Sequence, residues 1–262
     1  MTLVEGIKEV IKHKELVYQL TYAEFKSKYK QSVLGISWAI FQPLSLTLIY
    51  TLIFTLVVRM PSNGVPYPIF VYAGILPWTL FSTGVTRGVN SIVAYAGLVG
   101  KIYFPREILV VAAVLGGFID FMFGFLIFIL MMIYYQVPLT FNILYIFVIL
   151  LAMFFLTMGI SLALSAFNVF VRDINHVVPI VVQIWMYASP IIYPLSAIPP
   201  RYLNFYVMNP VVGLLEAFRN IFAIGIAPNL TYLGYSFFGS IIIFVIGYKI
   251  FKKLETKFAD VI

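Results

Sequence analysis

The feature that most constrains this chain is a long interval without any charged side chain, which covers residues 121–171. A transmembrane helix needs about 20 apolar residues, so this interval must hold two helices and a turn. Its polar break, residues 136–142, is where we expect the turn. Because 62% of the chain is hydrophobic and only 10% is charged, we expect an integral membrane protein.

The apolar runs predict six membrane spans, at residues 33–58, 68–93, 108–135, 143–167, 177–192 and 231–248. The expected fold class is an all-α integral membrane protein, with an amphipathic interface helix at residues 1–32 and a six-helix transmembrane domain at residues 33–262. Residues 194–230 are too long for a hairpin and too apolar for an ordinary loop. We therefore expect two short re-entrant helices there, on the external side.

The net charge of +7 is distributed unevenly over these spans. One side holds the lysines, namely Lys8, Lys12, Lys14, Lys26, Lys28, Lys30, Lys101, Lys249, Lys252, Lys253 and Lys257. The other side holds Arg59, Arg201 and Arg219. The positive-inside rule makes the lysine side cytoplasmic and predicts that both termini are cytoplasmic. The basic bias therefore indicates topology, aided by anionic membrane lipid, and we expect no nucleic-acid partner.

Residues 1–30 carry apolar side chains at helical spacing with lysines and glutamates between them, which predicts an amphipathic helix in the membrane interface. It serves either as a surface anchor alone or also as a contact for a cytoplasmic partner. The chain has no cysteine and two histidines, which excludes disulfides, thiolate metal sites and histidine-rich metal sites.

The charged break at residues 95–107 must leave the membrane between the second and third spans. Its corner, Tyr103-Phe104-Pro105-Arg106-Glu107, suits the start of a helix, because proline and an acidic side chain are favoured in the first turn. The alternative is that an exposed Tyr103–Phe104 pair, beside Arg106 and Glu107, inserts into a soluble partner. A second cytoplasmic loop covers residues 171–176 and holds Arg172 and Asp173.

Three charged residues fall in apolar surroundings. Asp120 lies within the third span, where a carboxylate suggests function by default. A proton relay needs a second group, and we expect no other acid or base deep in a span, so a structural hydrogen bond or a watery lumen is favoured. Glu216 and Arg219 are three residues apart and share one helix face. They form either a local ion pair or part of an external gate or substrate contact.

Aromatic residues gather at one end of the chain's spans and in spans 1 and 5. They are Tyr50, Phe54, Trp185, Tyr187, Tyr193, Tyr202, Phe205 and Tyr206. Tyrosine and tryptophan are common at membrane interfaces. Aromatic faces also stack on sugars, so the same residues would suit a wet pore through which a glycan slides.

A series of motifs, in this order, resembles the permease subunit of type-2 ABC exporters for polysaccharides, the Wzm-type O-antigen and teichoic-acid family. The motifs are Tyr29-Lys-Gln-Ser-Val-Leu-Gly-Ile-Ser-Trp38, Gly74-Ile-Leu-Pro-Trp78, Phe104-Pro-Arg-Glu107, Arg172-Asp173, Ser189-Pro-Ile-Ile-Tyr193 and Asn209-Pro210 through Arg219. They cover nearly the whole chain. Each is weak alone, and their shared order and spacing carry the resemblance.

The resemblance implies a homodimer that binds two copies of a separate ABC ATPase subunit. It also implies export of a lipid-linked polysaccharide across the cytoplasmic membrane through a channel between the permeases. ATP and magnesium would be held by the partner, so this chain is expected to need no cofactor and to be no enzyme.

Within the resemblance, the coupling segments are residues 95–107 and 171–176, and the gate helices are residues 195–224. The substrate path is then expected at Tyr50, Phe54, Trp185, Tyr187 and Tyr193. The external gate is expected at Tyr202, Phe205, Tyr206, Glu216 and Arg219.

Three other functions fit parts of the sequence. A permease of the same fold could export a drug or a small lipid. An ATP-independent secondary transporter would need an inverted repeat and paired buried charges, and a membrane transferase would need clustered carboxylates. The sequence pattern indicates neither.

Overall fold

The computed structural model describes residues 3–30, 32–62, 64–102, 104–138 and 140–261. Every regular element in these ranges is a helix. The elements are α1 (Leu3–Lys12), α2 (Lys14–Tyr29), α3 (Trp38–Leu52), α4 (Tyr67–Ala94), α5 (Ala96–Val99), α6 (Glu107–Tyr134), α7 (Ile146–Phe170), α8 (Ile174–Tyr187), α9 (Pro200–Val207), α10 (Pro210–Arg219), α11 (Leu230–Glu255) and α12 (Phe258–Val261). Short π-helical turns extend α3 over Ile53–Val57 and α10 over Asn220–Ile224.

Five helical segments in the described ranges are long and apolar enough to cross a bilayer: Trp38–Val57, Tyr67–Ala94, Glu107–Tyr134, Phe141–Phe170 and Leu230–Glu255. The multi-pass, all-helical class is therefore confirmed. The predicted fifth span is shorter than expected, because α8 has 14 residues and reaches only about 21 Å. The two helices expected in residues 194–230 are present as α9 and α10, and they meet at a bend of 104°.

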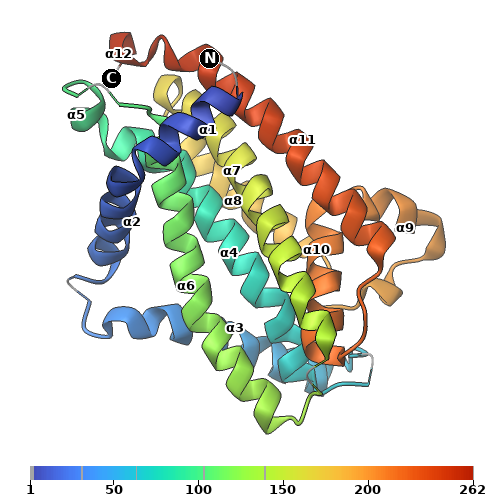
Figure 1. Ribbon diagram of the computed structural model, residues 1–262. Coiled ribbons are helices and arrows are strands. Elements are labelled where there is room, and N and C mark those ends of the chain that lie inside the picture. The colour runs from blue at the N-terminus through green and yellow to red at the C-terminus, as the bar shows by residue number, and fades with distance from the viewer. Residues whose placement is uncertain (1–2, 31, 63, 103, 139, 262) are drawn as a thin grey trace.

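Helices α4, α6, α7 and α11 lie side by side and form the core of the molecule (Figure 1). Their close approach depends on small residues. A side chain at Gly247 of α11 would collide with the Gly159 carbonyl group of α7, and one at Gly88 of α4 would collide with Ser161 of α7. Ser161 thus packs within one subunit, because small residues let helices in lipid approach closely.

Two helix starts show why the chain folds where it does. The Asn209 side chain accepts a hydrogen bond from the Val211 backbone N–H at 3.1 Å and so caps the helix that begins at Pro210. Asn229 caps α11 in the same way, accepting from the N–H groups of Thr231 and Tyr232.

The N-terminal segment is two helices rather than the single interface helix predicted for residues 1–32. The break falls at His13, whose ring Nδ1 lies 2.8 Å from the Glu9 carbonyl oxygen. Helix α2 then packs along α6, well below the end of the molecule where both termini lie (Figure 1). Residues of α2 thus reach into the helix bundle instead of staying at its edge.

Candidate functional site

Helices α3, α4 and α8 border a groove of about 580 Å³ on one face of the subunit. Helix α3 contributes Gln42, Leu46 and Tyr50; α4 contributes Trp78, Thr79, Ser82, Thr83, Thr86 and Arg87; and α8 contributes Pro179, Val182, Gln183, Met186 and Tyr187. The lining mixes hydroxyl, amide, aromatic and aliphatic groups, and Arg87 is the only charged side chain among the described residues that line it. Such a surface can accompany a polar polymer without holding it at fixed points.

A stripe of hydroxyl groups runs along the groove side of α4. Thr83 Oγ1 donates to the Thr79 carbonyl oxygen at 2.7 Å, and Thr86 Oγ1 donates to the Ser82 carbonyl oxygen at 2.8 Å. Because these hydroxyl hydrogens are used within the helix, the oxygen atoms keep their lone pairs for the groove. The stripe therefore presents acceptors, which suit a ligand rich in hydroxyl donors.

Two of the predicted path aromatics, Tyr50 and Tyr187, line this groove, and their side chains hydrogen-bond to one another. The other three lie outside the lining. Phe54 stacks on Tyr67 with ring centroids 6.3 Å apart, and Trp185 packs edge-on against the core ring of Phe81. The Tyr193 hydroxyl lies 3.0 Å from the Tyr187 carbonyl oxygen and 2.6 Å from the Tyr206 hydroxyl.

A buried charge cluster lies behind the groove and corrects the expectation that Asp120 has no charged neighbour. Lys28 Nζ and Arg87 NH2 both donate to Asp120 Oδ2, at 2.7 Å and 2.6 Å, and the Tyr29 hydroxyl donates to Oδ1 at 2.7 Å. Sequence reasoning missed these neighbours because α2 was expected to remain at the interface. Burial, followed by the charge of Arg87, lowers the pKa of Lys28.

The predicted exposure of Phe104 in the 95–107 loop is wrong, because its side chain is only 7% exposed and belongs to the core formed with α7 and α11. Tyr103 lies outside the described residues. Arg106 donates to the Glu255 carbonyl oxygen at 2.6 Å, and Glu107 forms a 2.7 Å ion pair with Lys252. The corner from Phe104 through Pro105 to Glu107 therefore begins α6 and joins it to the end of α11.

A cleft of about 580 Å³ remains beside this corner, between α1 and the end of α11. It is lined by Glu9, His13, Phe104, Pro105, Arg106, Lys252, Glu255 and Thr256. The residues exposed at the surface in the two predicted coupling loops include Lys101 and Ile102 in the first and Arg172 and Asp173 in the second. These groups, rather than Phe104, are available to a soluble partner.

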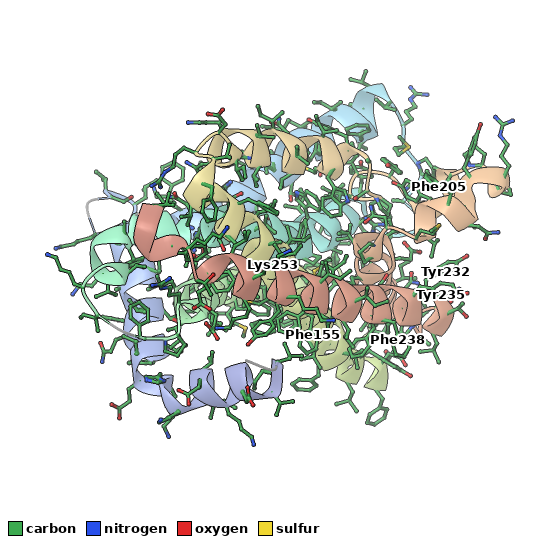
Figure 2. All side chains as sticks on the ribbon, turned by 90° about the horizontal axis from the view of Figure 1, so that it is seen from above. Phe155, Phe205, Tyr232, Tyr235, Phe238 and Lys253 are labelled. Carbon is green, nitrogen blue, oxygen red and sulfur yellow. The ribbon has the colours of Figure 1, made fainter. Side chains whose placement is uncertain are left out.

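The predicted gate residues divide into an exposed and a buried group. Tyr202 and Phe205 are exposed on α9, and Figure 2 shows Phe205 at the end of the molecule that also holds Tyr232 and Tyr235 of α11. Tyr206 contacts Tyr193, as described above. This aromatic end lies away from Lys253 in the same view.

Arg219 is fully buried, which favours a structural ion pair over contact with a substrate. Its NH1 group lies 3.6 Å from Glu216, and its NH2 group donates to the carbonyl oxygens of Pro190 and Ile191 at 2.7 and 2.9 Å. The guanidinium also lies 4.0 Å from the centre of the Phe70 ring. Arg219 thus joins α10 to α4 and to the turn after α8, a role that its spacing from Glu216 alone could not predict.

The groove lining on α4 was also missed from the sequence, although a signal was present. Thr79, Ser82, Thr83 and Thr86 recur at the spacing of one helix face within an otherwise apolar span. A polar stripe on a membrane helix indicates a face turned toward protein or water. Arg87 continues the same stripe.

Residues 15–223 match the model of the ABC-2 type transporter family. Three relatives extend over almost the whole chain. The O-antigen export system permease protein RfbA of Myxococcus xanthus is 30% identical over 98% of this chain and 99% of its own length. RfbA of Klebsiella pneumoniae is 29% identical over 95% of each chain. The polysialic acid transport protein KpsM of Escherichia coli is 25% identical over 92% of this chain and 94% of its own.

The match covers the helices that build the groove and the α9–α10 pair, and the expected order of motifs runs through the same residues. A multi-pass helical bundle with a groove of mixed polarity fits a transport subunit. This chain belongs to the ABC-2 type transporter family.

Proposed function

We propose that this chain is the channel-forming membrane subunit of an ATP-driven exporter that carries lipid-linked polysaccharide, of the O-antigen or teichoic-acid type, across the cytoplasmic membrane. The observation that carries the proposal is the groove between α3, α4 and α8, with two tyrosines facing a stripe of hydroxyl acceptors. The hydroxyl groups at the edge of a sugar can donate to the oxygen acceptors of the stripe, and its apolar face can stack on the tyrosine rings. The names of the relatives, which concern O-antigen export and polysialic acid transport, support the same substrate class.

In the proposed assembly, two copies of the chain enclose the path between them. The groove is open on one side, and α3 and α8 beside it carry exposed apolar residues such as Leu48, Ile180 and Ile184. A homodimer would cover these faces and close the groove. Two ATPase subunits, which hold ATP and magnesium, would bind at the lysine-rich end, where Lys101, Arg172 and Asp173 are exposed.

The path is tested by export in cells that lack the native subunit. We expect Tyr50→Ala combined with Tyr187→Ala to lower surface polysaccharide several-fold while the amounts of inserted subunit and co-purified ATPase stay unchanged. Aromatic stacking contacts on planar ligands are worth about 1–3 kcal/mol each, and those on sugars are expected at the lower end. The control is Phe41→Ala, an exposed α3 aromatic outside the groove lining. Normal export by the double variant would reject the groove as the glycan path.

The same strains distinguish a drug or small-lipid exporter from a glycan exporter. A loss of polysaccharide at the cell surface with unchanged drug sensitivity supports the glycan function. The opposite pattern would replace the proposal with the small-molecule alternative.

The proposed orientation, with six spans and both termini cytoplasmic, is tested by single cysteines, because the chain has none of its own. Asn204 and Lys253 are both exposed, on α9 and near the end of α11. We expect Asn204→Cys to react with an impermeant thiol reagent added outside intact cells, and Lys253→Cys to react only after lysis. Labelling of Lys253→Cys in intact cells would reject the orientation.

A further inference from the structure

The position of Arg87 distinguishes it from the rest of the groove. It is the last groove residue along α4 in the direction of the 95–107 loop, and among the described residues no other charged side chain lines the groove. Its guanidinium also belongs to the cluster with Asp120. Arg87 therefore brings one charge of the cluster into the open groove.

The cluster holds more positive than negative charge. Lys28 and Arg87 share a single oxygen, Oδ2 of Asp120, and the Tyr29 hydroxyl occupies the other. Since two cations face one carboxylate, a net charge of +1 remains. This charge is available in the groove through Arg87, whose side chain is 20% exposed.

Because Lys28 and Arg87 share one oxygen of Asp120, Arg87 can turn away from Asp120 without leaving that carboxylate unpaired. If its amino group turns toward a ligand in the groove, Lys28 and Tyr29 still satisfy Asp120. A water-sized cavity of about 20 Å³, lined by Lys28, Asp120 and the groove residues Gln42, Thr79 and Thr83, joins the cluster to the groove. If Arg87 were the sole partner of Asp120, the free energy lost by leaving the carboxylate unpaired would exceed the free energy gained from the contact between Arg87 and the ligand.

The rest of the lining narrows the kind of ligand. The hydroxyl stripe presents oxygen lone pairs, so the positive charge that can attract an anion comes from Arg87. Leu46, Val182 and Met186 offer apolar contact for a lipid chain. The groove is thus built for a molecule that is amphiphilic, rich in hydroxyl groups, and anionic at one point.

We propose that Arg87 binds the phosphate of an amphiphile at the base of the groove, where a guanidinium can donate two parallel hydrogen bonds to one phosphate. This inference rests on the proposed function for the source of the phosphate, which would be the ester linking the polysaccharide to its lipid. The headgroup of an anionic bilayer lipid carries the same chemistry and is the other source.

The first experiment compares farnesyl diphosphate with farnesol as probes for the purified full-length chain in detergent, with tryptophan fluorescence as the signal because Trp78 lines the groove. We expect the diphosphate to bind at least tenfold tighter than farnesol to the native chain. Arg87→Gln should bring the two affinities within twofold, and Arg87→Lys should give an intermediate ratio. The matched control, Lys101→Gln, removes an exposed cation outside the groove and should change nothing. Equal binding of the two probes to the native chain overturns the proposal.

A second variant keeps the test valid if Arg87→Gln does not fold. Thr83→Glu introduces a carboxylate one helical turn before Arg87 on the groove face and removes none of the three hydrogen-bond partners of Asp120. We expect it to weaken farnesyl diphosphate at least tenfold, and Thr83→Gln, which matches its size, to weaken it less than twofold. Equal losses for the two variants would show that charge at this point is irrelevant and would reject the site.

The source of the phosphate is decided in lipid nanodiscs. If phosphatidylglycerol weakens farnesyl diphosphate binding tenfold relative to phosphatidylcholine, and does not do so in Arg87→Gln, the site serves an anionic bilayer lipid. Unchanged affinity assigns it to the polysaccharide carrier. Both results support the phosphate site.

Failure of this site and failure of the proposed function give different results. Equal binding of the two probes, with lost export in the Tyr50→Ala, Tyr187→Ala variant, rejects only the phosphate site. A selective diphosphate site, with normal export in that variant, rejects only the glycan path.

Discussion

Helices α4 and α3 are both apolar enough to span a membrane, yet 78% of the best α4 window is buried within the subunit and only 11% of that of α3. The difference follows small residues rather than hydropathy. Helix α4 contains Gly74, Gly84 and Gly88, and each faces a neighbouring helix or turn so closely that a side chain would collide. Helices α3 and α8 contain no glycine. In lipid, where apolar surface alone drives little association, close backbone approach decides which helices join the bundle.

The largest effect on stability is expected from removing Asp120 of α6, whose carboxylate pairs with Arg87 of the tightly packed helix α4. Asp120→Ala leaves the partly exposed Lys28 and Arg87 without their counter-charge. Breaking a fully buried pair costs about 3–5 kcal/mol, and we expect a loss below that range here because the two cations keep 33% and 20% of their side-chain surface exposed. We expect a large drop in the unfolding temperature of the purified subunit. Asp173→Ala, at an exposed acid, is the control and should have almost no effect. Equal stability of the two variants would mean that the cluster contributes nothing to the bundle.

The next largest effect is expected at the α7–α11 contact. Gly247→Val inserts a side chain against the Gly159 backbone, and overpacking costs about 1–3 kcal/mol, with backbone collisions at the upper end. Gly234→Val, on the same helix, enters open space and is the matched control. Thermal unfolding should separate the two, and a native-like Gly247→Val would contradict the close approach described here.

A smaller effect is expected at the helix starts. Asn229→Ala removes two hydrogen bonds from the first turn of α11, and loss of such a cap costs about 1 kcal/mol. Ser37→Ala, at the start of α3, should cost less because the Ser37 side chain makes no cap hydrogen bond. Denaturation of the two variants under one condition measures the difference, and a larger loss at Ser37 would reverse the comparison.

The smallest effect on the isolated subunit is expected on α8. Ile180 and Ile184 are 60% and 64% exposed, so Ile180→Ala with Ile184→Ala should change subunit stability by less than about 0.5 kcal/mol per site. The same double variant should weaken the proposed homodimer, which chemical crosslinking in membranes can measure. A strongly destabilised subunit would show that this face packs internally.

The sequence predicted what depends on local pattern. The uncharged interval predicted two helices and a turn, now α6 and α7, and the apolar length of residues 194–230 predicted two short helices, now α9 and α10. Tyr50 and Tyr187 were placed on the path by residue type alone, and both line the groove.

What depends on tertiary contact was not predictable in the same way. Phe104 looks exposed in a charged loop, but it is buried in a core formed with the end of α7 and with α11. Helix α11 lies more than a hundred residues away in the sequence. Asp120 looks alone in its span because Lys28 belongs to a helix whose path no local pattern reveals. The length of α8 was overestimated because the apolar run continues through Pro190 after the helix has ended.

Helix α6 carries charged attachments at two levels. Glu107, its first residue, is tied to Lys252 of α11, and Asp120, thirteen positions later, is tied to α2 and α4. The two points are about 20 Å apart along a continuous α-helix. We expect a displacement imposed at the 95–107 corner to be transmitted along this helix to Asp120 and from there to its partner Arg87. We therefore expect movement at the 95–107 corner to change the affinity of Arg87 for an anion in the groove.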